Sequence, residues 1–292
     1  MAVKFIYTNS NGGSVTIGGD APYLYQNHSG FNGPKNNIYT VKSPNQDGES
    51  FVGSDLDKRQ LTIDGSIVAN TDDLQPLRRQ LTQIFNPKLA GVLEYINGNF
   101  DTKIDCRVDT PPAWADDDYD GIQDFSVILL CPSPFFKALE QQRTEIAAWT
   151  GGIEFPLDIL TEGIEFEVRS PSLIVNVNNP GDVECGMMVV FTALAELTNP
   201  SIVNVNTQEA IKIKADMQQG DKIIVTTGYG SNKVELMQAG VTTSAMNLLD
   251  ILNSTLPFMK LAPGDNLIRY AAATNQDNLQ CVIYNTPQYL GG

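Results

Sequence analysis

One group of side chains has the types and spacing of a metal-binding loop. Its members fit the pattern D-x-D-x-D-G-x-x-D and are Asp116, Asp118, Asp120 and Asp124. Calcium prefers several carboxylate oxygens around a tight turn, which this spacing supplies. Val127, however, stands where an EF-hand places a bidentate glutamate, and prolines precede the loop instead of a helix. The segment is therefore either a weak calcium loop or a solvated acidic turn between two strands.

Other reactive side chains are sparse. The only histidine, His28, lies in a polar, glycine-containing stretch that is typical of a loop. A zinc site or a catalytic triad needs clustered ligands or an imidazole, and no CxxC, GxSxG, HExxH or P-loop pattern occurs. We therefore expect no enzymatic activity and no required cofactor, with Ca²⁺ as the one candidate ion. Buried thiols are expected at Cys106, Cys131, Cys185 and Cys281.

The charge balance argues against nucleic-acid and membrane partners. The 292 residues carry 34 acidic and 19 basic side chains, which gives a formal net charge of −15. Affinity for nucleic acid and for an anionic bilayer depends on cations that neutralise phosphates. The sequence also has no apolar run of membrane-spanning length and no amino-terminal signal pattern, so we expect synthesis in the cytoplasm without a signal peptide.

Alternation of apolar and polar residues predicts β-strands along most of the chain. In residues 103–109 every second side chain is apolar and is expected to face a core: Ile104, Cys106 and Val108. Two hairpins are also predicted. One joins residues 222–226 to 233–237 across a glycine-containing turn, and the other joins residues 267–271 to 279–284.

The segment from 71 to 85 has helical periodicity instead. Acidic residues occupy its first turn, and Pro87 follows it. Its apolar residues recur at helical spacing: Leu74, Leu77, Leu81 and Ile84. We predict an amphipathic helix packed on a sheet, with weaker helical stretches at 134–149 and 244–252.

This helix also supplies the candidate interface residues. Leu74, Arg78 and Arg79 are predicted to contact a neighbouring subunit, because outward-facing arginines favour interfaces with acidic partners. A solvated helix face is the alternative interpretation.

The predicted fold class is mainly β, with two antiparallel β-sandwich-like domains. The first domain, residues 1–136, carries the helix. A proline-containing acidic connector, residues 137–167, leads to the second domain, residues 168–292.

The order of several turn and strand motifs resembles a known family. These motifs are Arg59–Gly65, Asn86-Pro87, Gly91–Tyr95, Cys131–Phe136, Asn178–Asp182, Asn199–Asn204, Gln219–Asp221 and Leu261–Asn266. Together they are similar to the distal tail protein (Dit) family of long, flexible-tailed bacteriophages. The resemblance runs from about residue 50 to the carboxy terminus.

The resemblance implies a structural role in the virion. The first domain would form a hexameric ring at the distal end of the tail tube, as a hub that joins the tube protein to the tail-tip or baseplate proteins. The second domain would be a galectin-like β-sandwich that holds receptor-binding protein in some phages. The chain would be made in the host bacterium and would have no enzymatic activity.

Two other functions compete with this interpretation. A saccharide-binding adhesin could use the galectin-like domain, but residues 150–292 contain no histidine or tryptophan and only Arg169 and Arg269 as arginines. A β-sandwich glycoside hydrolase would need two carboxylates at a defined separation, and nothing in the sequence singles out such a pair.

Overall fold

The computed structural model describes residues 3–98, 100–115, 121–146, 148–151, 167–170, 174–228, 230–254 and 258–292. The chain divides into two compact units: Met1–Leu139 with Gln288–Gly292, and Glu140–Pro287. It is mainly β, and α1 (Thr71–Ile84) is the only α-helix in the part that the structure describes, which confirms the predicted fold class. No helix in these ranges is long and apolar enough to cross a membrane.

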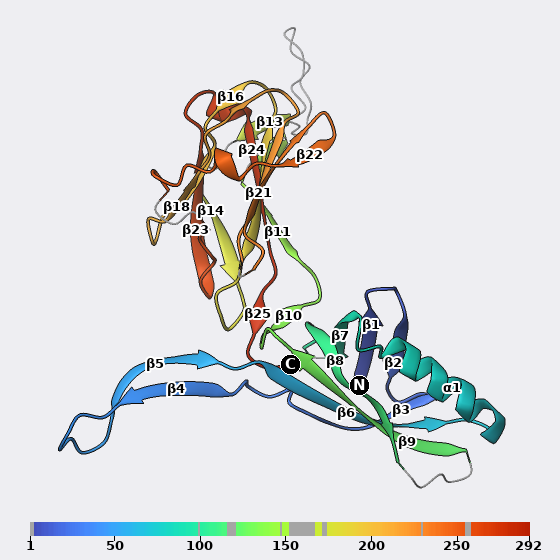
Figure 1. Ribbon diagram of the computed structural model, residues 1–292. Coiled ribbons are helices and arrows are strands. Elements are labelled where there is room, and N and C mark those ends of the chain that lie inside the picture. Colours follow the sequence, from blue (N-terminus) through green and yellow to red (C-terminus); the bar gives the residue numbers. More distant parts are fainter. Residues whose placement is uncertain are drawn as a thin grey trace. The chain divides into compact units, whose positions relative to one another are not determined.

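The first unit is built on one antiparallel sheet with the strand order β2-β1-β7-β8-β9-β6-β3 (Figure 1). These strands are β1 (Lys4–Asn9), β2 (Ser14–Ile17), β3 (Tyr23–Ser29), β6 (Arg59–Val68), β7 (Ala90–Ile96), β8 (Thr102–Trp114) and β9 (Ile122–Cys131). The two end strands meet where Gly18 bridges Leu24, and the Gly18 N–H donates to the Tyr23 carbonyl at 3.1 Å. The expected sandwich-like packing therefore arises from one sheet that curls on itself.

Alternating burial along these strands builds the core of the first unit. The side chains of Ile104, Cys106 and Val108 on β8 are buried, as the alternation predicts. The neighbouring strands β6 and β9 bury every second residue in the same way. The inner face of the curled sheet is thus apolar, and the helix covers part of it.

The helix α1 packs its apolar side chains on this core. Leu74, Leu81 and Ile84 are buried, and the acidic side chains in its first turn complement the positive end of the helix dipole. The helix ends one residue before the predicted boundary. Phe85 closes it by donating its backbone N–H to the Leu81 carbonyl at 2.9 Å, and its ring stacks on Tyr7 with centroids 4.3 Å apart.

Between β3 and β6 the chain forms a separate two-stranded hairpin, which we call the arm (residues 36–56; Figure 1). Its strands β4 (Asn36–Val41) and β5 (Ser50–Leu56) pair only with each other. Nearly all residues of both strands are exposed, so the arm contributes no buried side chain to the core of the first unit.

A buried arginine fastens the carboxy terminus to the first unit. Arg59, at the start of β6, is only 4% exposed, and burial lowers the pKa of its guanidinium. Its Nε donates to the Pro134 carbonyl at 2.9 Å, and its Nη2 donates to the Leu290 carbonyl at 2.6 Å. Its Nη1 donates to the carbonyls of Gly30 and Asn32. Four backbone acceptors from three separate segments thus share one cation.

The second unit is a β-sandwich. One sheet has the order β11-β24-β15-β20-β21-β22, and the other has the order β14-β23-β17-β18. The strands of the first are β11 (Gln142–Glu145), β15 (Met187–Ala193), β20 (Lys222–Thr226), β21 (Lys233–Gln238), β22 (Val241–Ser244) and β24 (Leu279–Asn285). Those of the second are β14 (Ile174–Asn179), β17 (Ser201–Asn204), β18 (Ala210–Lys212) and β23 (Gly264–Ala271). Both sheets contribute to one core cluster.

Short elements complete the second unit: β12 (Ala148–Gly151) with β13 (Glu167–Ser170), β16 (Leu197–Thr198) with β19 (Asp216–Met217), and the 3-10 helices η1 (Met246–Leu248) and η2 (Gln276–Asn278). The first predicted hairpin is confirmed, because β20 pairs with β21 in the expected register. The second is wrong, because β23 and β24 belong to different sheets.

The chain crosses from one unit to the other twice. The two segments of the first unit at which it leaves and returns are paired with each other. Strand β10 (Phe136–Ala138) pairs with β8 on one side and with β25 (Gln288–Tyr289) on the other. The predicted domain boundaries differ from this division, because the last residues return to the first unit and β11, placed in the predicted connector, joins a sheet of the second. The predicted helical stretch at 134–149 is wrong, since strands occupy it, and residues 152–166 of the connector lie outside the described ranges.

Candidate functional site

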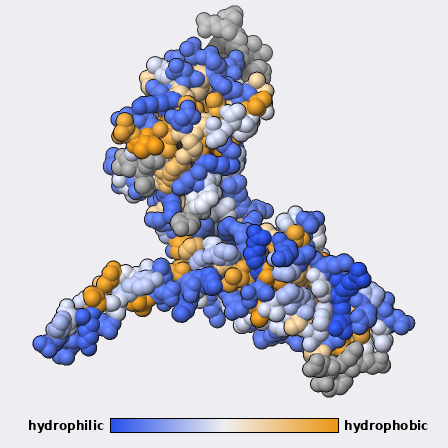
Figure 2. All heavy atoms as spheres, in the orientation of Figure 1, coloured by the Kyte–Doolittle hydropathy of each residue, from blue (hydrophilic) through white to orange (hydrophobic). Residues whose placement is uncertain are grey.

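The arm exposes apolar side chains that none of the described residues of its own unit covers. Figure 2 shows hydrophobic surface along it. The exposed residues are Ile38 (62%), Tyr39 (52%), Val41 (55%), Phe51 (68%) and Val52 (66%). An isolated two-stranded hairpin is at best marginally stable in water, and clustered exposed apolar residues mark interaction sites. The arm is therefore a candidate interaction surface.

Polar contacts within the arm hold its two strands together. The Tyr39 hydroxyl donates to Asp55 at 2.9 Å, and this hydrogen bond raises the pKa of Tyr39. Asn37 donates to the other oxygen of Asp55 at 3.1 Å, and the Thr40 hydroxyl donates to Glu49. Residues 36–56 contain three acidic side chains and one lysine, so the arm is acidic as well as apolar.

The helix surface presents a second feature, a hollow of about 630 Å³ between α1 and the end of β8. Its lining residues are Gln75, Arg78, Arg79, Thr82, Gln83, Phe85, Asn86, Pro87, Pro111 and Trp114. The guanidinium carbon of Arg78 lies 4.7 Å from the centre of the Trp114 ring, so a cation–π contact positions it. The described residues that line this hollow include two cations and no acid.

The three predicted interface residues occupy different environments. Leu74 is buried in the core of the first unit, so its side chain holds the helix to the sheet. Arg78 is half-buried against Trp114 and does not face fully outward, whereas Arg79 is exposed as expected. Their contact with a neighbouring subunit stays a prediction.

The acidic loop is described only at its end. Asp116, Asp118 and Asp120 lie outside the described residues. Asp124 lies on β9, where its Oδ1 accepts hydrogen bonds from Ser66 at 2.6 Å and from Gln26 at 2.9 Å. No group of three potential metal ligands occurs within the described ranges. Calcium binding stays a prediction, and calorimetric titration of the wild type against Asp118→Asn tests it.

His28 lies on β3 and not in a loop, within an aromatic cluster. Its Nδ1 lies 2.6 Å from the Tyr25 hydroxyl, and its ring packs edge-on against Phe31 with centroids 4.9 Å apart. Burial lowers the pKa of the His28 imidazole from its ordinary value of 6.5. The four cysteines are free and buried, as predicted.

This lowered pKa makes the stability of the first unit depend on pH. At pH values between the pKa of His28 in the folded chain and 6.5, the unfolded chain binds the proton more readily than the folded chain. The contribution of His28 to stability is therefore complete above pH 6.5 and decreases below it. We expect the free energy of unfolding to drop more steeply between pH 7.5 and 5.5 in the wild type than in His28→Gln. Denaturant titrations at both pH values measure the free energy of unfolding. An equal decrease in the two proteins would contradict the prediction.

Comparisons with known proteins find a family match in each of the two units. Residues 10–131 match the family model of a phage tail protein RIFT-related domain, and residues 180–289 match that of a siphovirus-type tail component, C-terminal domain. No curated protein matches.

Solved structures show the same fold at low sequence identity. The Dit protein of phage SPP1, described as a paradigm of the hub adsorption apparatus in phages that infect Gram-positive bacteria, matches with a TM-score of 0.68 at 12% identity, over 97% of this chain and 98% of that chain. Two structures of the phage P2 baseplate in its activated conformation also match, one with Ca (TM-score 0.52) and one with Sr (TM-score 0.51). Each of the two shows 9% identity over 98% of both chains.

The two family models, in this order and over most of the chain, define a structural component of a phage tail. More particularly, the chain belongs to the distal tail protein family of siphovirus-type bacteriophages.

Proposed function

We propose that the first unit assembles into a ring of six copies at the distal end of the tail tube, and that the ring is the hub between the tube protein and the tail-tip or baseplate proteins. The arm is the observation that carries this proposal. Its exposed apolar residues need a partner, and a cyclic assembly of identical subunits provides one for every copy.

The second unit would then serve as the attachment point for tail-tip, baseplate or receptor-binding proteins. The second unit is an insertion in the chain between β10 and β25, and the sheet of the first unit stays continuous. We further propose that the chain resides in the virion and has no enzymatic activity. Direct contact with nucleic acid or membrane is not part of this function, which agrees with the net charge of −15.

The native mass of the purified protein tests the ring. We expect a species of six times 31.9 kDa, with rings visible by negative staining. A protein that stays monomeric at every concentration, alone and in the presence of the tail-tube protein, would contradict the proposal.

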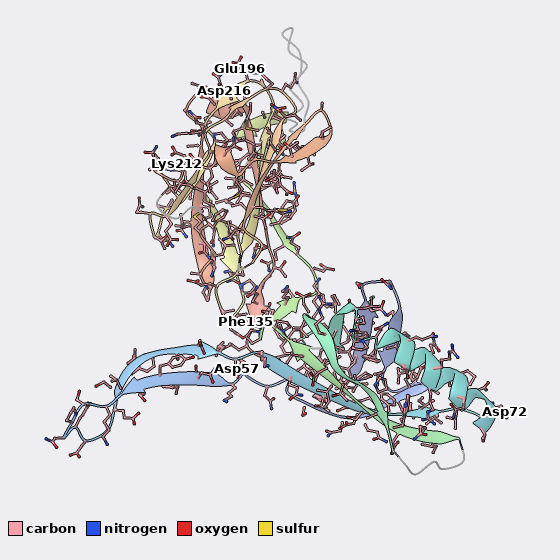
Figure 3. All side chains as sticks on the ribbon, in the orientation of Figure 1. Asp57, Asp72, Phe135, Glu196, Lys212 and Asp216 are labelled. Atoms are coloured by element: carbon pink, nitrogen blue, oxygen red, sulfur yellow. The ribbon has the colours of Figure 1, made fainter. Side chains whose placement is uncertain are left out.

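The structure gives the saccharide-binding alternative little support. A polar hollow of about 430 Å³ at the edge of β17 and β18 includes Lys212 (labelled in Figure 3), Lys214 and Asp250. Lys214 and Asp250 form an ion pair at 3.2 Å, and no aromatic ring lies among the described residues that line the hollow. A glycan array with the full chain distinguishes this alternative from the hub.

A further inference from the structure

Two of the four buried thiols lie on neighbouring strands of the first unit, β8 and β9. The register of these strands places Arg107 opposite Leu130, so the next two residues, Cys106 and Cys131, also lie opposite each other. Both belong to the core cluster on the inner face of the sheet, where Cys106 is 4% exposed and Cys131 is fully buried. The two thiols are therefore neighbours within the core.

These thiols interact with each other and with a buried cation. A hydrogen bond to the Cys131 thiol raises the pKa of the Cys106 thiol, and burial raises it further. On the other side of β9, the register with β6 places Arg59 opposite Cys131. Burial lowers the pKa of the Arg59 guanidinium, and Cys131 partly offsets this effect, so the two side chains lie within electrostatic reach. Cys106, Cys131 and Arg59 thus form a row across three adjacent strands.

The geometry of the two strands suits a covalent bond between the sulfur atoms. Directly opposite residues in an antiparallel pair have Cα atoms about 4.5 or 5.5 Å apart, depending on the hydrogen-bonding position. Disulfide bonds span Cα–Cα distances of about 4.4–6.8 Å. The backbone of β8 and β9 therefore does not have to move before the two thiols can be joined.

We propose that Cys106 and Cys131 form an intrachain disulfide bond between β8 and β9, with a low-molecular-weight disulfide as the oxidant. One cysteine loses its proton, and its sulfur attacks the small disulfide and releases one small thiol. The sulfur of the other cysteine then attacks the mixed disulfide and releases the second small thiol. The protein gives up two protons and two electrons, and the small disulfide takes up both.

The bond would fasten the first unit at the point where the chain leaves it. Cys131 is the last residue of β9, and β10 begins at Phe136. Disulfide bonds persist in oxidising surroundings, whereas the cytosol keeps thiols reduced, so the bond would form on a particle outside a cell. This inference adds a modification site to the first unit and does not depend on the proposed ring.

A redox titration of the full chain with glutathione tests the proposal. The protein is equilibrated at a series of ratios of reduced to oxidised glutathione, in one set by refolding in the redox buffer and in the other in denaturant. The remaining thiols are alkylated, and mass spectrometry without reduction identifies the linked cysteines. We expect a bond between Cys106 and Cys131 with an equilibrium constant at least about tenfold higher in the folded chain, because the fold holds the two sulfur atoms together.

The matched control removes the two thiols of the second unit, with Cys185→Ala and Cys281→Ala. Cys185 bridges Leu261, and Cys281 lies opposite Phe191, so neither has a cysteine as its cross-strand partner in these pairings. This control should leave the equilibrium constant unchanged, whereas Cys131→Ala should abolish the bond. Circular dichroism confirms that each variant folds.

Equal equilibrium constants in the folded and unfolded chain would overturn the proposal. A refolded chain that keeps all four thiols free, or that links Cys106 or Cys131 to glutathione instead, would overturn it as well.

Discussion

Replacing Arg59 with methionine is expected to lower the free energy of unfolding of the first unit by about 4 kcal/mol. The change leaves four carbonyl oxygens without their common donor, at a place where the arginine is only 4% exposed. A hydrogen bond to a charged group contributes about 1.5–3 kcal/mol, and a whole domain is stable by about 5–15 kcal/mol. The loss therefore removes a large part of the total stability.

Denaturant titration with hydrogen exchange at residues 288–292 measures this effect. Because the Nη2 of Arg59 binds the Leu290 carbonyl, exchange at the carboxy terminus is expected to accelerate as well. Arg59→Lys should fall between the wild type and methionine, since an ammonium has three donors and cannot reach all four acceptors. Arg79→Met, at an exposed position, is the control and is expected to change stability little. A loss below about 1 kcal/mol for Arg59→Met would contradict the role of the buried cation.

Replacing Phe51 and Val52 with serine is expected to weaken self-association at least about a hundredfold while the first unit stays folded. Covering a phenylalanine or valine side chain contributes about 1.5–3 kcal/mol each, and 1.4 kcal/mol corresponds to a factor of ten. Both residues are more than 60% exposed in the isolated chain, so their loss costs nothing within the core.

Sedimentation velocity and thermal unfolding of the same samples separate the two effects. The matched control is Val241→Ser with Ile251→Ser, which removes two similarly exposed apolar side chains (63% and 66%) from the second unit. It should leave self-association unchanged. A Phe51→Ser, Val52→Ser protein that assembles like the wild type would show that the arm is covered by something other than a second copy.

Local patterns in the sequence predicted local structure well. The alternation around Cys106 and the helical spacing from Leu74 to Ile84 both reflect burial of one face, which a single segment can reveal. The hairpin of β20 and β21 was predictable because its short turn forces the two strands to pair. The strands β23 and β24 are also separated by a short connection in the sequence. Each pairs with strands that are more distant in the sequence, so this connection joins the two sheets of the sandwich.

The features that matter most for the proposed function depend on distant contacts. The acceptors of Arg59 lie up to 231 residues away in sequence, so no local pattern marks it as a buried residue. The apolar residues of the arm resemble those of any half-buried strand, and only the structure shows that no described residue outside the arm covers them. The acidic spacing at Asp116–Asp124 suggested one loop, whereas Asp124 pairs with Ser66 in the sheet and bonds to its hydroxyl.

The paired passages at β10 and β25 have a mechanical consequence. In the proposed hub, two covalent tethers share any pulling force on the second unit. One tether leaves from β10, which is hydrogen-bonded to β8, and the other enters β25, beyond which the Leu290 carbonyl is held by Arg59. A single proteolytic cut in either tether leaves the second unit still attached through the other. The insertion therefore makes the attachment of the second unit resistant both to pulling and to a single break in the chain.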